Sequence, residues 1–194
     1  MSLHTAIQTA LENHPRTVLR KKGFRQSAVL VPVVDHDDGG LFILTRRSKN
    51  LPSHAGQIAF PGGSIDKGEE LVTAALREAW EEIALPKERV ALAGKLNDIW
   101  TPSKFIVTPV VGTLDSAAHL KPNPAEVDRI FTVPLRFFAD DSNARTKDVE
   151  VNGFKRTVYF YDYDGETIWG ATAFIIRNLL YVLGMIDSAM PEDE

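Results

Sequence analysis

Short apolar runs separated by turn residues make up most of the hydrophobic pattern of this chain. Runs of strand length that are rich in Val, Ile, Phe and Tyr indicate β-strands. The pattern predicts strands over residues 27–35, 41–47, 58–60, 90–100, 105–115 and 129–135. It also predicts a hairpin over 148–165, because Asn152-Gly153 is the favoured two-residue turn between antiparallel strands.

Helical patterns occur at the two ends of the chain and once near its middle. Residues 3–12 are amphipathic and stop at His14-Pro15, whereas residues 166–185 are mostly apolar. Because Arg177 and Asn178 interrupt the apolar pattern, we expect a core or dimer-interface helix rather than a lipid-binding one. This order of elements predicts an α/β/α sandwich with a mixed β-sheet. We expect residues 1–194 to form one domain with an N-terminal helix and a C-terminal helical extension.

Composition removes several functional classes. The chain has no cysteine, which excludes disulfides, zinc-thiolate sites and a thiol nucleophile. The net charge of -4 argues against broad binding of nucleic acid through phosphate neutralisation. No apolar run is long enough to span a membrane, and the N-terminus does not resemble a signal peptide. We therefore expect a cytoplasmic protein without a membrane or nucleic-acid partner.

The central helical segment gathers three carboxylates in "GGSIDKGEELVTAALREAWEEI", residues 62–83. At about 100° per residue, Glu78, Glu81 and Glu82 lie within an arc of roughly 100°. Apolar residues are expected on the opposite, core-facing side: Val72, Leu76, Ala79, Trp80 and Ile83. An acidic stripe alone is usually a solvated face, since like charges at i,i+4 cost only a few tenths of a kcal/mol. Solvation and a bound cation are thus both open.

The residues around the helix favour the cation. Gly62 and Gly63 allow the backbone to turn where a side chain would not fit. Arg77 can reach Glu69 in the preceding loop, brace that loop against the helix, and orient a carboxylate by a two-pronged contact. Converging carboxylate oxygens suit Mg²⁺ or Mn²⁺.

At these residues the sequence resembles the Nudix hydrolase family, whose box is G-x5-E-x7-R-E-U-x-E-E-x-G-U with U aliphatic. The positions that fit are Gly63, Glu69, Arg77, Glu78, Glu81, Glu82 and Leu85, with Ala79 at the first U. Ala84 stands where the family has its last glycine, which puts the geometry of the helix end in question.

The resemblance implies metal-dependent hydrolysis of a diphosphate linked to another group. It implies Glu78 and Glu82 as metal ligands, with Glu81 as a further one, and Glu69 as a supporting residue. Arg77 has an orienting role. The general base is either Glu78 or a loop carboxylate, for which Glu126 is the candidate; an exposed loop glutamate is the alternative for Glu126.

Residues 43–63 also resemble the signature of the coenzyme A pyrophosphatase branch, L-L-T-x-R-[SA]-x3-R-x3-G-x3-F-P-G-G. Pro52 occupies a position where the signature has arginine. The resemblance implies coenzyme A or a derivative as the small-molecule substrate. The candidate substrate-binding residues are Arg46, Arg47, Ser48, His54, Gly62 and Gly63. Since side chains alternate along a strand, at most one of the two arginines should point into the site.

Three functions remain open at this point. The first is hydrolysis of coenzyme A to 3′,5′-ADP and 4′-phosphopantetheine. The second is hydrolysis of another nucleoside diphosphate derivative such as ADP-ribose or NADH, and the third is a non-catalytic nucleotide sensor. A homodimer is possible in each case.

Overall fold

The computed structural model describes residues 1–37, 39–151 and 154–187. Its helices are α1 (Leu3–Glu12), α2 (Leu71–Ile83), α3 (Leu135–Ala139) and α4 (Gly170–Val182), with short 3-10 turns at Lys87–Arg89 and Asp141–Asn143. An eight-stranded sheet contains β1 (Arg25–Val34), β2 (Leu41–Arg47), β3 (Ile58–Ala59), β4 (Gly62–Ser64), β5 (Ala91–Lys95), β6 (Ile99–Trp100), β7 (Phe105–Leu114) and β8 (Val127–Pro134). A smaller sheet contains β9 (Ala144–Val151), β10 (Phe154–Tyr163) and β11 (Glu166–Trp169).

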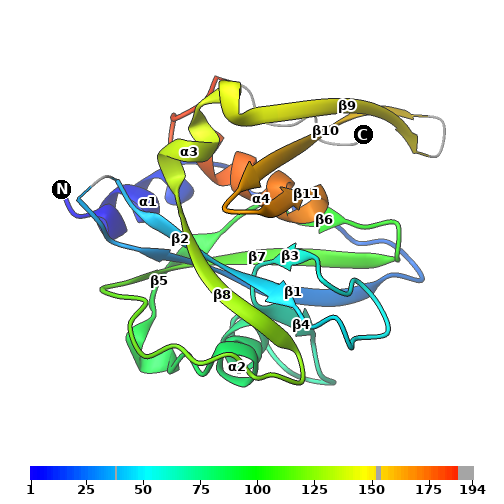
Figure 1. Ribbon diagram of the computed structural model, residues 1–194, viewed down its shortest axis with the longest axis horizontal. Helices are drawn as coiled ribbons and strands as arrows, with labels where there is room; N and C mark the ends of the chain where they lie inside the picture. Colours follow the sequence, from blue (N-terminus) through cyan, green and yellow to red (C-terminus); the bar gives the residue numbers. More distant parts are fainter. Residues whose placement is uncertain (38, 152–153, 188–194) are drawn as a thin grey trace.

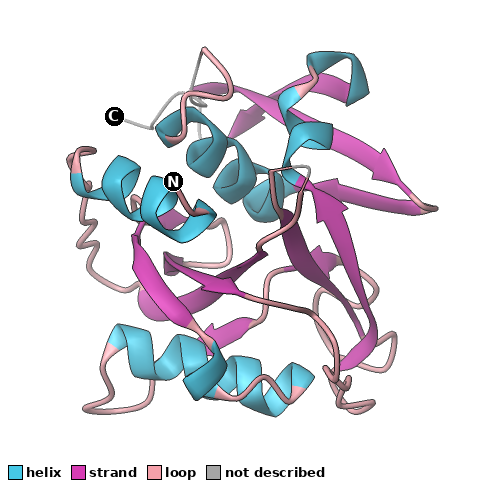
Figure 2. Ribbon diagram, turned by 90° about the vertical axis from the view of Figure 1, so that its left-hand side faces the viewer, coloured by secondary structure: helices cyan, strands magenta, loops and turns pink. Residues whose placement is uncertain are grey.

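The larger sheet separates two layers (Figures 1 and 2). Helix α2 packs on one face, while α1, α4 and the three-stranded sheet lie on the other. Strand β1 pairs in parallel with β7 along its whole length and antiparallel with β2 and β4. The predicted α/β/α arrangement with a mixed sheet is therefore confirmed.

Burial on both faces explains the continuous apolar run of β1. Val31 and Val33 belong to the core shared with α1 and α4, whereas Ala28 and Leu30 belong to the core under α2. Alternation along the strand places these two sets on opposite faces. On α4, most residues are buried within the chain, so the expectation of a core helix holds.

Two predicted elements have different boundaries in the structure. Residues 166–169 form strand β11 rather than the start of a helix, because buried Glu166 and Ile168 alternate with exposed neighbours. Gly170, at φ 61°, then allows the chain to turn into α4. The predicted strand 90–100 is interrupted between β5 and β6, where the Asn97 side chain accepts a hydrogen bond from the backbone of Thr17.

The predicted hairpin over 148–165 is present as the antiparallel pair of β9 and β10. Its turn residues, Asn152-Gly153, lie outside the described residues. Strand β4 was not predicted, since glycine is rare in strands and "GGS" has no apolar side chain.

Candidate active site

Helix α2 turns part of its acidic stripe toward the sheet. The residues buried on α2 are Ala74, Ala75, Ala79, Glu82 and Ile83. Trp80, predicted in the core, is 57% exposed, so that prediction is wrong. Alanines let the helix approach β1 and β4 closely, and an indole has no room in such an interface. Val72 and Leu76 pack on the edge of this core and are only partly buried.

Two of the three carboxylates lie close to the glycines of β4. The Gly62 N–H donates to Glu82 Oε2 at 3.3 Å. A Cβ at position 63 would come within 2.5 Å of the Glu78 carboxylate, and one at position 62 would be 2.5 Å from the Val29 Cα. Glycine is therefore required at both positions, because any side chain would displace either the carboxylate or the strand. Gly62 and Gly63 thus shape the carboxylate site.

Arg77 joins the loop before α2 to the carboxylates. Its Nε and Nη2 donate to the two oxygens of Glu69 at 2.9 and 3.0 Å. Its Nη1 donates to Glu78 at 2.9 Å and to Glu81 at 3.1 Å, and its Nη2 also reaches the Ser64 carbonyl at 3.1 Å. The predicted contact between Glu69 and Arg77 is confirmed, and it is a two-pronged ion pair.

The carboxylates differ strongly in environment. Glu82 is 2% exposed, whereas the Glu81 side chain is 47% exposed. Burial raises the pKa of Glu82 to about 8, against the attraction of Arg47, and the neighbouring Glu78 and Glu126 raise it further. Burial also raises the pKa of Glu78, although Arg77 opposes the shift. By contrast, the hydrogen bond from Arg77 lowers the pKa of Glu69.

The two adjacent arginines of β2 point to opposite faces, as predicted. Arg47 Nη1 lies 3.6 Å from Glu82 Oε1 on the α2 side. Arg46 Nη1 donates to Glu166 of β11 at 2.8 Å on the other side. Arg129 of β8 binds the same Glu166 oxygen at 3.1 Å. Arg47 is therefore brought to the carboxylates, whereas Arg46 connects the large sheet to the small one.

Glu126 lies close enough to Glu78 and Glu82 for its charge to raise the pKa of both. Its backbone carbonyl accepts the N–H of Ser48 at 2.8 Å, so the end of β2 is tied to the Glu126 loop. The Ser48 side chain is buried and accepts a hydrogen bond from Asn50. His54 is exposed, and its ring nitrogen Nδ1 forms a hydrogen bond with the Gln57 side-chain oxygen at 2.9 Å.

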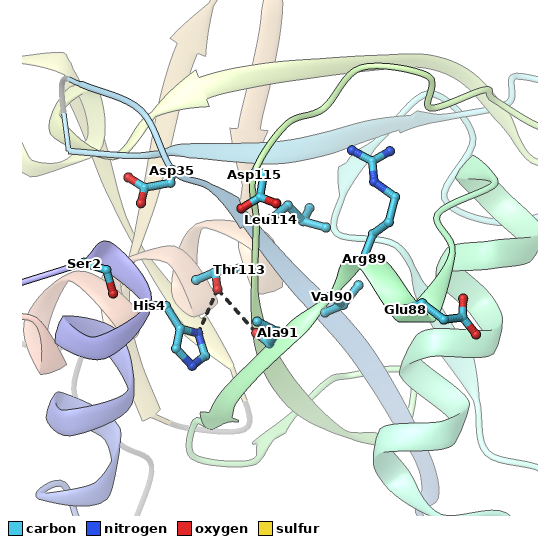
Figure 3. A pocket seen from close by; sticks show the side chains of 10 residues that line it. All are labelled: Ser2, His4, Asp35, Glu88, Arg89, Val90, Ala91, Thr113, Leu114 and Asp115. Carbon is cyan, nitrogen blue, oxygen red and sulfur yellow. Dashed lines mark hydrogen bonds between the residues drawn. The ribbon is translucent and has the colours of Figure 1, made fainter.

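A cavity of about 520 Å³ lies elsewhere (Figure 3). It is lined by residues at the far ends of β1 and β7, among them Asp35 and Asp115, and by the start of α1. There His4 bonds to Thr113 at 2.8 Å. The distance along β1 from Asp35 back to Ser27, which pairs with Ser64, is roughly 25 Å. This cavity is therefore separate from the carboxylate site.

Comparison with known proteins identifies the family. A family model described as "NUDIX domain" matches residues 24–152. The chain belongs to the Nudix hydrolase family. Among its relatives, an uncharacterized Nudix hydrolase NudL from Photorhabdus laumondii is 44% identical over 156 residues, covering 80% of this chain and 83% of the relative. The NudL of Pectobacterium atrosepticum, also uncharacterized, is 43% identical over 160 residues, covering 80% and 81%.

Solved structures share the fold. A Deinococcus radiodurans protein has a TM-score of 0.54 at 17% identity, with 82% of this chain and 88% of that chain covered. A MutT/nudix family protein from Enterococcus faecalis has a TM-score of 0.53 at 13% identity, with 87% and 71% covered. No helix among the described residues is long and apolar enough to cross a membrane.

The Nudix helix ends on an alanine in an unusual conformation. Ala84 has φ 52° and ψ 36°, the left-handed region that favours glycine. Its N–H still donates to the Trp80 carbonyl at 2.9 Å, and the Leu85 N–H to the Ala79 carbonyl at 3.3 Å. The departure from the Nudix box therefore preserves the helix end at the cost of backbone strain.

The donors at this Nudix site fit a divalent cation. They are carboxylate oxygens, the ligands that Mg²⁺ and Mn²⁺ prefer, and Nudix hydrolases generally need such ions. Burial raises the pKa of Glu82 because it penalises the charged form of the carboxylate. A neighbouring cation would stabilise that charged form and so offset the cost of burial. Among the described residues no three acidic or histidine side chains already converge as ion ligands. Arg77 instead neutralises Glu78 and Glu81, and an ion would compete with it.

Proposed function

We propose that this Nudix hydrolase cleaves the diphosphate bond of coenzyme A and its thioester or oxidised forms, giving 3′,5′-ADP and 4′-phosphopantetheine or its acyl form. The observation that carries the proposal is the contact between Arg47 and Glu82, at 3.6 Å. Arg47 belongs to the coenzyme A signature and Glu82 to the Nudix box. The segment that implies the substrate and the segment that implies the chemistry therefore meet at one place.

Further contacts of coenzyme A signature residues lie at the end of β2. Thr45 Oγ1 donates to the Ala59 carbonyl at 3.1 Å, which fastens β2 to β3. Arg47 Nε is buried without a hydrogen-bond partner among the described residues, so the guanidinium retains donor capacity beside the carboxylates. An arginine with this capacity suits a phosphate oxygen of the diphosphate.

The proposed mechanism assigns a task to each side chain. Glu78 and Glu82, with Glu81, would hold Mg²⁺ or Mn²⁺, which when bound neutralises diphosphate oxygens and acidifies water. Glu126 or Glu78 accepts the proton of the attacking water, since both carboxylates lie in the cluster. Arg77 fixes the loop and the carboxylates, and Arg47 orients the diphosphate. Ser48 and Arg46 position the end of β2, whereas His54 remains a candidate substrate contact.

The deciding experiment is a product analysis. The protein is incubated with Mg²⁺ and, separately, coenzyme A, 3′-dephospho-coenzyme A, ADP-ribose and NADH, and the products are identified by mass. We expect coenzyme A to give the highest kcat/KM, with 3′,5′-ADP as a product. Absence of turnover on all four substrates, with nucleotide binding retained, would instead identify a sensor.

Another nucleoside diphosphate derivative is the second candidate. Pro52 replaces the second signature arginine and removes one possible phosphate contact. Faster hydrolysis of ADP-ribose or NADH than of coenzyme A would favour this alternative.

We further propose that the whole chain acts as one domain. Helices α1 and α4 lie outside the residues that the family model matches. Nevertheless one apolar cluster joins them to β1 and β2, and it includes Ile7, Leu11, Ile176 and Leu179. A single unfolding transition followed by both tryptophan fluorescence and circular dichroism would support it. Sedimentation would show whether the protein is a homodimer.

A further inference from the structure

The connection between β7 and β8 is fastened to the carboxyl end of α2. The N–H of Lys121 donates to the Ile83 carbonyl at 3.1 Å, and the N–H of Asn123 donates to the Glu82 carbonyl at 2.9 Å. Carbonyls in the last turn of a helix have no partner within the helix, so the connection satisfies two of them. In Figure 1 this connection runs along α2 before β8 begins. Asn123 therefore lies beside the backbone of the buried Glu82.

Asn123 begins a tight turn, Asn-Pro-Ala-Glu, that ends at Glu126. Asparagine at the first position and proline at the second favour a β-turn, because the amide can accept a backbone N–H and the proline ring fixes φ. The Asn123 carbonyl accepts the N–H of Glu126 at 2.9 Å and that of Val127 at 2.7 Å. The Asn123 Oδ1 accepts the N–H of Ala125 at 3.2 Å. Both the backbone and the side chain of Asn123 thus close the turn.

The other half of the Asn123 amide faces the Glu126 carboxylate. Nδ2 lies 3.5 Å from Glu126 Oε1, near the outer limit of a hydrogen bond. The two partners fix the orientation of the amide, because a backbone N–H requires the oxygen and a carboxylate requires the NH₂ group. At the end of the turn, the Glu126 carbonyl accepts the Ser48 N–H at 2.8 Å. The backbone of Glu126 is therefore held by the end of β2, and its carboxylate is oriented by Asn123.

Glu126 differs from the carboxylates of α2 in its partner. Arg77 binds both Glu78 and Glu81, and Arg47 lies beside Glu82. The structure gives the Glu126 carboxylate a neutral amide instead. A neutral donor orients a carboxylate while weakening its basicity less than a cation does. This partner therefore suits a carboxylate that has to accept a proton.

We propose that Asn123 is the positioning residue for Glu126, and that Glu126 rather than Glu78 accepts the proton of the attacking water, an inference that rests on the proposed function. The amide donates to Oε1 and leaves Oε2 to accept the proton. As the water oxygen bonds to phosphorus and the bridging P–O bond breaks, the proton of the water passes to Glu126 and later to solvent. Asn123 acts only through Glu126.

A double-mutant cycle tests this role. Asn123→Asp keeps the oxygen that accepts the Ala125 N–H but replaces the donor by a second negative charge, so the turn is kept and the Glu126 carboxylate is repelled. We expect kcat to fall about tenfold and KM to stay within about twofold of the wild type. In a Glu126→Gln background the same substitution should change kcat by less than about twofold, because no carboxylate is left to orient.

The controls separate position from folding and from charge. Asn13→Asp adds the same charge at an exposed position at the end of α1 and should leave kcat within about twofold of the wild type. Asn123→Ala removes both side-chain contacts, so it should lower the melting temperature more than Asn123→Asp does. Loss of a general base lowers turnover by roughly 10²–10⁴-fold, so the residual activity of Glu126→Gln is measured at high enzyme concentration.

Nuclear magnetic resonance provides a readout that needs no turnover. The side-chain amide signals of Asn123 are identified by their disappearance in Asn123→Asp. Glu126→Gln should shift these signals in the metal-free protein, because it removes the charged acceptor of Nδ2. Glu81→Gln, the same change at an exposed position of α2, should leave them in place.

Four results would overturn the proposal. They are near-normal kcat in Glu126→Gln, near-normal kcat in Asn123→Asp, an equal loss from Asn123→Asp in both backgrounds, and Asn123 amide signals that Glu126→Gln does not move. The cycle is measured with whichever diphosphate the product analysis shows to be hydrolysed. A failure of coenzyme A as the substrate therefore leaves the role of Asn123 intact, and a failed cycle leaves the proposed substrate intact.

Discussion

Replacing Glu82 by glutamine should stabilise the metal-free protein at alkaline pH. Glu82 is 2% exposed and has a pKa of about 8, against 4.5 for an ordinary glutamate, because burial penalises its charged form. At pH values between 4.5 and 8, Glu82 is deprotonated in the unfolded chain but stays protonated in the folded chain. Stability contributed by Glu82 is thus complete below pH 4.5 and falls as pH rises toward 8.

The size of the effect follows from the pKa difference. Each pH unit in this interval costs about 1.4 kcal/mol, so the loss by pH 8 is on the order of 4 kcal/mol. Glutamine is neutral at every pH and its side-chain oxygen can still accept the Gly62 N–H. The Glu82→Gln variant should therefore lack this pH dependence.

Urea unfolding in EDTA at pH 5 and pH 8 measures the difference. We expect wild type and Glu82→Gln to agree within about 1 kcal/mol at pH 5, and the variant to be more stable by a few kcal/mol at pH 8. Glu81→Gln, a control on the same helix whose side chain is 47% exposed, should show no such gain. Millimolar Mg²⁺ should stabilise the wild type but not Glu82→Gln. A Glu82→Gln variant no more stable than the wild type at pH 8 in EDTA would refute the reasoning.

Further predictions concern the same helix and its loop. Glu78→Gln should lower kcat by orders of magnitude with an unchanged circular dichroism spectrum; near-normal turnover would remove Glu78 from the mechanism. Gly63→Ala should lower turnover and Mg²⁺ affinity together, since its Cβ would lie 2.5 Å from the Glu78 carboxylate, and wild-type kinetics would count against that close packing. Ala84→Gly should raise the free energy of unfolding by about 1 kcal/mol in urea, because glycine adopts positive φ without strain. Arg47→Ala should raise KM for every diphosphate substrate alike; a selective effect on coenzyme A over its 3′-dephospho form would assign Arg47 to the 3′-phosphate instead.

Contacts between residues close in sequence could be predicted well. The spacing of Glu69 and Arg77 brings a loop carboxylate back onto the first turns of a helix, and the structure shows the two-pronged pair. The alternation of side chains along a strand likewise predicted that Arg46 and Arg47 point to opposite faces of the sheet, and they do. Both predictions rest on the local geometry of a helix or strand, which is the same in every fold.

The rotation of α2 about its axis could not be predicted in this way. Hydrophobicity favours Trp80 over alanine for the core, yet Trp80 is exposed and Ala74 and Ala75 are buried. The distance between α2 and β1 decides which side chains fit between them, and this distance is set by tertiary packing.

The burial of Glu82 connects the stability of the fold to its chemistry. A solvated acidic stripe would have left all three carboxylates exposed at almost no cost. Instead the packing of the alanine face of α2 against the glycines of β4 buries Glu82. Arg47 Nη1, 3.6 Å from Glu82 Oε1, offsets only part of the cost of burying this carboxylate, since the pKa of Glu82 is still about 8. Residues that destabilise the fold in this way persist where the arrangement serves a ligand. A divalent cation beside Glu82 would supply the missing positive charge. The free-energy cost of burying Glu82 without a cation therefore favours the interpretation of the acidic stripe as a metal site.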